Sequence, residues 1–206
     1  MKTIFVNVDT LDDFMMKHGA LYVPDAETII GNLRNLTFYA GKHKTYVLNL
    51  ADRHNGDSKE ISSNPDFIET FPEHCMENTK GAEFIPATTP KSPYIIHWNQ
   101  KLIDEQLVSS NRNAVLYKDN FDLFQGNPHT ERVIDLLSPE NAVVYGVAEN
   151  VCVDYAVRGL SVRGIKVYVP LDAVKALPNI PEKAHTWNAV LTDTEAILKL
   201  LKEGKL

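Results

Sequence analysis

A cysteine stands where a buried strand is expected to turn into a helix. The apolar run from Ala142 to Tyr145 predicts the strand, Gly146 breaks it, and apolar residues recur at helical spacing after Cys152. A cysteine in the first turn of a helix lies at the positive end of the helix dipole. That position lowers the pKa of a thiol and offers free N–H groups to an oxyanion. The same pattern also fits a buried structural cysteine.

Two other predicted strands end on side chains that a thiol nucleophile needs. The strand at residues 4–8 runs into Asp9, and the strand at residues 114–117 ends at Lys118. A carboxylate can accept the thiol proton and later protonate a leaving group, and an ammonium can stabilise both negative charges. Alone, Asp9 also fits a helix cap and Lys118 a solvated charge. Function in parallel α/β folds gathers at the carboxyl ends of strands, so the joint pattern favours catalysis.

A second cluster of potential ligands follows the strand at residues 46–50. Asp52 and His54 are two residues apart, and Glu60 and His74 lie in the long segment that comes next. Two carboxylates with two imidazoles suit a divalent ion such as Zn²⁺, Mn²⁺ or Fe²⁺. Alternative ligands remain open in the same segment, namely Cys75, Glu69 and Asp57.

Predicted strands and helices alternate along the chain. This alternation predicts an α/β fold with three layers, α/β/α, around a central, mainly parallel sheet, in a single domain over residues 1–206. The segment from about residue 55 to residue 90 is irregular, and so long a loop is usually functional. Further strands are predicted at residues 94–98, 142–145 and 165–169, and helices at residues 27–39, 102–108, 131–137 and 194–202 and from Cys152 onward.

Composition narrows the class of protein. A net charge of −6 argues against general nucleic-acid binding, which needs a basic surface. The acidic N-terminal stretch does not fit a signal peptide, and no apolar run approaches the roughly 18 residues of a membrane span. Two distant cysteines make no disulfide framework. We therefore expect a soluble, cytoplasmic protein with a small molecule as its partner.

Three segments resemble the isochorismatase-like cysteine hydrolases, and within them the nicotinamidases. VNVDTLDDF at residues 6–14 resembles the opening D-x-Q-x-D-F, with Asp9 at the catalytic aspartate. LYKD at residues 116–119 carries the lysine, Lys118, and GVAENVCVDYAV at residues 146–157 is similar to G-x-A-T-D-x-C-V, with Cys152 as nucleophile.

Two more segments resemble the metal site of the nicotinamidases. ADRH at residues 51–54 is similar to the metal-binding D-x-H. FPEHCMENTKGAEF at residues 71–84 resembles W-P-x-H-C-x-x-G-T-x-G-A-E, which metal-free relatives lack. The third metal position of the family is His or Glu, and the spacing of Glu60 matches it better than that of Glu69.

The resemblance implies hydrolysis of nicotinamide to nicotinate and ammonia through a cysteine thioester, as in NAD salvage. It implies one divalent ion, zinc above manganese or iron, which binds the pyridine nitrogen. The N–H groups of Ala148 and Cys152 would hold the oxyanion, after a cis peptide entering Ala148, and family members are often homo-oligomers. Phe14, Phe71 and Phe124 would form the ring walls.

Several positions depart from the family pattern. Leu11 replaces a glutamine, Phe71 a tryptophan and Asn78 a glycine, and Glu149-Asn150 replaces a frequent Thr-Asp pair. These departures leave a second function open, a cysteine amidohydrolase acting on another small amide or ureido compound. A third, a non-catalytic binding module on the same scaffold, is disfavoured because all the catalytic positions are filled.

Overall fold

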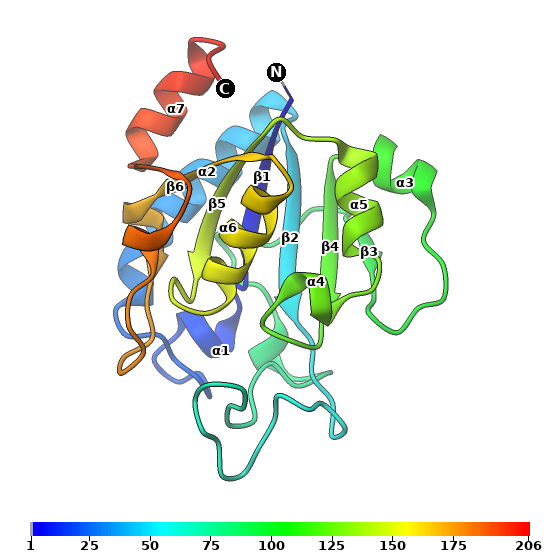
Figure 1. Cartoon of the computed structure of the whole chain (residues 1–206), viewed down its shortest axis with the longest axis vertical. Helices are drawn as coiled ribbons and strands as arrows, with labels where there is room; N and C mark the ends of the chain where they lie inside the picture. The colour runs from blue at the N-terminus through cyan, green and yellow to red at the C-terminus, as the bar shows by residue number, and fades with distance from the viewer. Residues whose placement is uncertain (1) are drawn as a thin grey trace.

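One parallel sheet organises the molecule (Figure 1). The computed structural model describes residues 2–206, and its strands follow the order β3-β4-β2-β1-β5-β6-β8, with β7 paired to β5. The strand pairs run parallel, which confirms the predicted α/β fold. The strands are β1 (Thr3–Val8), β2 (Tyr46–Asp52), β3 (Tyr94–Ile96), β4 (Asn113–Lys118), β5 (Asn141–Val147), β6 (Lys166–Pro170), β7 (Val174–Lys175) and β8 (Val190–Thr192).

Helices cover both faces of the sheet. In Figure 1, α4, α5 and α6 lie in front of the strands, and α4 contacts both α5 and α6. Helix α2 lies behind the strands and contacts α7. Central strands such as β5 are buried along their whole length, as expected for strands covered on both faces. The helices are α1 (Asp12–Met15), α2 (Ile30–His43), α3 (Glu105–Ser110), α4 (Leu123–Gly126), α5 (Thr130–Leu137), α6 (Cys152–Val162) and α7 (Thr194–Lys202).

Two predicted helices have different bounds in the structure. The helix expected at residues 27–39 begins as a 3₁₀ turn and continues as α2 beyond Gly41, because Lys44 adopts the left-handed conformation and its N–H bonds to Ala40 O. The helix expected at residues 102–108 lies later, because the Asp104 carboxylate caps it by accepting from the Leu107 N–H. The short elements α1, α4, β7 and β8 were not predicted.

The sheet register brings the candidate site residues to one edge. Val8 pairs with Leu50 on one side and with Gly146 on the other, and Asp52 pairs with Lys118. The residues that follow β1 and β5, and those that end β2 and β4, therefore meet at the carboxyl edge. The irregular segment after β2 lies below this edge in Figure 1 and covers it.

Gly146 allows β5 to approach β1 at this edge. Its φ is +122°, and a Cβ at this position would lie 2.0 Å from Val8 O. Only glycine fits such a contact in this conformation. The chain can then turn from β5 into the segment that leads to Cys152. Among residues 2–206, no helix is both long and apolar enough to cross a membrane.

Candidate active site

Asp9, Lys118 and Cys152 meet at the carboxyl edge of the sheet. The Lys118 Nζ lies 2.9 Å from Asp9 Oδ2 and 3.7 Å from Cys152 Sγ. It also donates a hydrogen bond to Asp52 Oδ1. Asp9 and Lys118 are fully buried, and 6% of Cys152 is exposed, so any substrate that reaches the thiol must be small. The three residues that the sequence singled out are therefore in contact in the structure.

Burial governs the proton affinities of this group. It raises the pKa of the Cys152 thiol well above its usual value, against the opposing effect of Lys118. Burial thus acts against the lowering effect that the helix terminus was expected to have on this pKa, because desolvating a thiolate costs free energy. Burial also raises the pKa of Asp9, with the Asp52 charge adding to it. For Lys118 burial acts the other way, but the charges of Asp52 and Asp9 outweigh it and raise the pKa.

The turn between β5 and α6 leads directly into Cys152. The peptide between Val147 and Ala148 is cis, as the resemblance implies. Cys152 is the first residue of α6, where N–H groups have no acceptor within the helix. The Ala148 carbonyl accepts from the N–H groups of Val151 and Val153, at 3.1 and 3.0 Å, which fixes the turn.

The four predicted metal ligands form a buried cluster. Asp52, His54, Glu60 and His74 each offer one ligand atom, and these atoms lie within 4.8 Å of one another. The His74 Nε2 lies 3.7 Å from Glu60 Oε1 and 3.8 Å from Asp52 Oδ2, and the His54 Nε2 lies 4.0 Å from Glu60 Oε1. The sequence placed these residues in two separate segments, and the structure joins them.

Neighbouring acceptors orient both imidazoles towards the cluster. The His54 Nδ1 lies 2.9 Å from Asp119 Oδ1, and the His74 Nδ1 lies 2.7 Å from Pro72 O. A proton on each Nδ1 leaves each Nε2 with a free lone pair, as in metal sites whose histidines are held by a second acceptor. Ser58 donates to the same Asp119 carboxylate.

Unpartnered atoms in the cluster fit a bound cation. The His54 Nε2 and the Asp52 Oδ2 are buried without a hydrogen-bond partner among the described residues. Burial and the Asp52 charge raise the pKa of Glu60 to about 7. Two carboxylates, two imidazole nitrogens and unsatisfied lone pairs at the centre match the donor set of a borderline divalent ion.

The alternative metal ligands lie elsewhere. Cys75 is buried, but its Sγ lies 3.8 Å from Gly81 O, a contact outside the cluster. Glu69 and Asp57 are exposed to solvent. The structure therefore places Glu60, and not Glu69, beside the two histidines.

Aromatic rings surround His74. The ring centres of Phe14 and Phe71 lie 5.3 and 6.2 Å from the His74 ring. Phe121, which the sequence reasoning missed, lies 6.3 Å from Phe71, and its N–H donates to Glu60 Oε2 at 2.7 Å. Phe121 also contacts the ring of Tyr155 at 5.0 Å.

Phe124, the third ring predicted from the sequence, lies away from this group. The Arg163 guanidinium stacks 3.4 Å above its ring centre, and a Cβ at Gly159 would clash with its ring edge. Gly159 is two helical turns along α6 from Cys152. In this structure Phe121, and not Phe124, lies beside the cluster, and a wall role for Phe124 stays a prediction.

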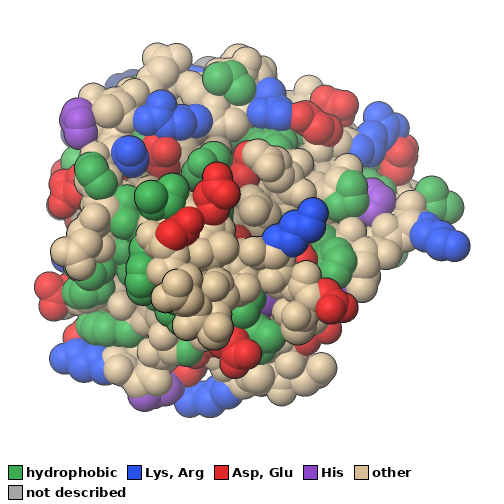
Figure 2. Space-filling view, turned by 60° about the horizontal axis from the view of Figure 1, so that its bottom comes forward, with side chains coloured by type: hydrophobic (Ala, Val, Ile, Leu, Met, Phe, Trp, Pro, Cys, Tyr) green, Lys and Arg blue, Asp and Glu red, His purple; other side chains and the backbone are tan. Residues whose placement is uncertain are grey.

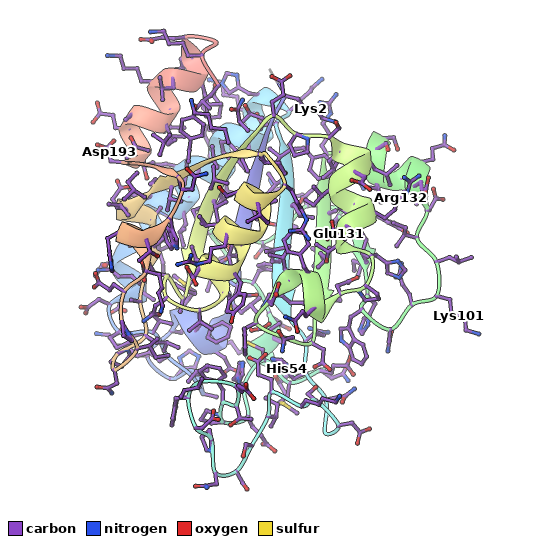
Figure 3. The ribbon with its side chains drawn as sticks, in the orientation of Figure 1. Lys2, His54, Lys101, Glu131, Arg132 and Asp193 are labelled. Atoms are coloured by element: carbon purple, nitrogen blue, oxygen red, sulfur yellow. The ribbon has the colours of Figure 1, made fainter. Side chains whose placement is uncertain are left out.

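Asp119 is a second residue of the candidate site that sequence reasoning missed. Its only sequence signal was its place directly after Lys118, at the same strand end as the predicted catalytic residues. Figure 3 labels His54, its partner, at the lower end of the sheet beneath α4. Figure 2 looks onto this end of the molecule, where acidic, basic and hydrophobic side chains are interspersed. This face of the molecule is therefore of mixed charge.

The parallel sheet and the buried cysteine, lysine and aspartate at its edge define a hydrolase of the isochorismatase-like α/β class. Residues 3–196 match the family model described as Isochorismatase domain, and the chain belongs to this family. A search of curated protein sequences gives no match.

Solved structures of similar fold include enzymes that act on different amides. N-carbamoylsarcosine amidase from Thermoplasma acidophilum is 22% identical, over 95% of this chain and 98% of that chain, with a TM-score of 0.72. Nicotinamidase/pyrazinamidase from Bacillus subtilis is 18% identical, over 94% and 100%, with a TM-score of 0.70. Pyrazinamidase of Pyrococcus horikoshii in complex with zinc is 20% identical, over 94% and 99%, with a TM-score of 0.71. At these identities the likeness shows the fold.

Proposed function

We propose that the chain is a metal-dependent nicotinamidase that hydrolyses nicotinamide to nicotinate and ammonia. One observation carries this proposal: Lys118 contacts both Cys152 and Asp52, so the thiol lies directly beside the four-residue metal cluster. A flat pyridine ring between these two groups would present its carboxamide to the sulfur. The aromatic rings around His74 are suitable walls for such a ring.

The pKa shifts of the site residues support attack by the thiol with a carboxylate as the base. Asp9 accepts the proton of Cys152, and the sulfur forms a bond to the amide carbon. The raised pKa of Asp9 makes it a better base than an exposed aspartate and later a competent acid. It then protonates the amide nitrogen, the C–N bond breaks and ammonia leaves, and water hydrolyses the thioester to release nicotinate. Lys118 stays charged and stabilises the thiolate.

Backbone N–H groups would stabilise the charge that develops on the amide oxygen. Cys152 and Ala148 offer these groups at the turn into α6, where the helix dipole adds a positive potential. Because the charge appears only in the tetrahedral intermediate, these contacts accelerate the chemical step.

Asp52, His54, Glu60 and His74 would hold one divalent ion, with Zn²⁺ favoured by the two imidazoles. When bound, the ion supplies a Lewis-acid anchor for the pyridine nitrogen. Phe14, Phe71 and Phe121 then confine the ring and fix the carboxamide within reach of Cys152.

The charge balance of the site favours a neutral substrate. The Lys118 ammonium, which contacts the thiol, already faces the carboxylates of Asp9 and Asp52. A ureido substrate that carries a carboxylate would need a further cation to bind it. The second candidate function, hydrolysis of another small amide or ureido compound, rests on the similarity of fold to N-carbamoylsarcosine amidase.

Ammonia release by the purified protein tests the proposal. Nicotinamide, pyrazinamide and N-carbamoylsarcosine are compared before chelation, after chelation and after Zn²⁺, Mn²⁺ or Fe²⁺ is added back. We expect nicotinamide turnover that falls on chelation and returns with metal. Faster ammonia release from the ureido compound would establish the second function. Turnover of nicotinamide that is unchanged by chelation would show that the reaction does not require a metal ion.

A further inference from the structure

The nucleophile turn, residues 148–152, carries two buried polar side chains. Glu149 and Asn150 follow Ala148 in the sequence and are 5% and 4% exposed. Their bonds lead away from the thiol, to a segment between β7 and β8 that we call the buttress segment (residues 176–187).

The two side chains tie the turn to four positions of the buttress segment. The Asn150 Nδ2 donates to Leu177 O at 2.9 Å and to Ile180 O at 2.8 Å, and the Asn150 Oδ1 accepts from the Leu177 N–H at 3.0 Å. The Glu149 carboxylate accepts from the N–H groups of Lys183, at 2.9 Å, and Ala184. Hydrogen bonds from two adjacent side chains therefore tie this turn to the buttress segment.

The same segment is held again farther along α6. The Trp187 Nε1 donates to Asp154 Oδ1 at 2.6 Å, and Arg158 bonds both to Asp154 and to Thr186. These contacts anchor the buttress segment to the body of the helix and not to the turn. The two sets of contacts can therefore be broken separately.

We propose that Glu149 and Asn150 are positioning residues that hold the Ala148 and Cys152 N–H groups in place for the oxyanion by tying the nucleophile turn to the buttress segment. The inference rests on the proposed amide chemistry. The Glu149 N–H also donates to Lys175 O at 2.7 Å, so both the backbone and the side chain of this residue are fixed. A shift of the turn would move the N–H groups relative to the reacting carbonyl and slow the chemical step.

Alkylation of Cys152 by iodoacetamide, with and without an aldehyde, separates this role from a structural one. The thiol adds across the aldehyde C=O bond, and the oxygen of the resulting thiohemiacetal takes the place of the oxyanion. Protection of Cys152 from alkylation, read on its peptide by mass spectrometry, gives the aldehyde affinity. Acetaldehyde and pyridine-3-carbaldehyde are the probes, so that the readout does not depend on nicotinamide as substrate.

Glu149→Ala is compared with Glu149→Gln, which keeps an acceptor oxygen, and with Arg158→Ala, which loosens only the far anchor. We expect Glu149→Ala to weaken protection by about tenfold or more, while the rate of alkylation without aldehyde stays within about threefold of wild type. Glu149→Gln and Arg158→Ala should retain protection. Asn150→Asp, which loses both donations to carbonyl oxygens, should behave like Glu149→Ala and serves if that variant does not fold.

Equal protection in Glu149→Ala and wild type would overturn the proposal. So would equal losses in Glu149→Ala and Arg158→Ala, since these would indicate a structural role alone. If the wild-type protein releases no ammonia from any amide but the aldehyde pattern holds, the proposed function fails and the positioning role stands.

Discussion

Lys118 donates a hydrogen bond to Asp52, so one buried ammonium joins the thiol site to the metal cluster. This lysine also faces Asp9 at 2.9 Å and Cys152 at 3.7 Å. A change at either site therefore alters the electrostatics of the other. The four residues Asp52, His54, Glu60 and His74 form a candidate metal site and are also part of the electrostatic environment of Cys152.

Lys118→Met tests this coupling. The substitution leaves Asp9 and Asp52 buried without their cation, and breaking a buried ion pair in this way costs about 3–5 kcal/mol of unfolding free energy. Urea denaturation measures that loss, and turnover should disappear as well. Lys80→Met, which removes an exposed partner of Asp12, should change the unfolding free energy by less than about 1 kcal/mol. Equal effects of the two substitutions would contradict the account.

Metal binding should stabilise the folded protein. At a Zn²⁺ concentration about 100 times the Kd, ligand linkage adds about 2.7 kcal/mol to the unfolding free energy. Thermal unfolding with and without Zn²⁺, together with metal content per chain, measures the effect. Glu60→Gln and His54→Ala should each reduce the metal content, whereas Glu69→Gln, at an exposed position, should not. If Glu69→Gln lost the metal while Glu60→Gln retained it, Glu69 and not Glu60 would be the ligand.

Stability should depend on pH through Glu149. Burial raises the pKa of this carboxyl above 4.5. A carboxyl whose folded pKa is raised contributes most below its unfolded pKa, and this contribution is lost as the pH rises through the folded value. The unfolding free energy of wild type relative to Glu149→Gln should therefore fall as the pH rises from 4.5 towards neutrality. Urea denaturation across this range measures it, with exposed Glu195→Gln as the comparison, and a difference that is flat or rises with pH would refute the argument.

The ring walls can be tested with two phenylalanines of the same segment. Phe121→Ala should raise the KM for nicotinamide, because this ring contacts Phe71 beside the metal cluster. Phe124→Ala should leave the KM unchanged and lower the unfolding free energy by less than the about 3–5 kcal/mol of a fully buried phenylalanine, because its ring is only partly buried. Steady-state kinetics and urea denaturation separate these outcomes. If only Phe124→Ala raised the KM, Phe124 and not Phe121 would be the wall of the substrate pocket.

The parts of the site that the sequence predicted are those set by local patterns. Apolar runs that end in a polar residue marked the ends of β1 and β4, and parallel strands carry such ends to one edge. The positions of Asp9, Lys118 and Cys152 at or just after predicted strand ends were therefore enough to predict that they meet. Asp52, His54, Glu60 and His74 stood out by their residue types after one strand, and the resemblance to a metal-binding family then favoured Glu60 over Glu69.

The parts that could not be predicted depend on contacts between distant segments. Asp119 holds His54 across 65 residues of sequence, and an acid after a strand has many other uses. Phe121 and Phe124 are three residues apart on a short segment, and only packing against Phe71 or Arg163 distinguishes them. Burial is the largest contribution to the pKa of Cys152, and burial depends on packing that the position of the residue on the helix does not reveal.

The most direct test of the central claim is to trap the covalent intermediate. The protein is mixed with nicotinamide, quenched in acid and digested, and the peptide that contains Cys152 is weighed by mass spectrometry. We predict a nicotinoyl group on Cys152, absent from the Cys75 peptide and from a Cys152→Ala variant that remains folded. Ammonia release at the wild-type rate by Cys152→Ala, or an acyl group on another residue, would contradict the account.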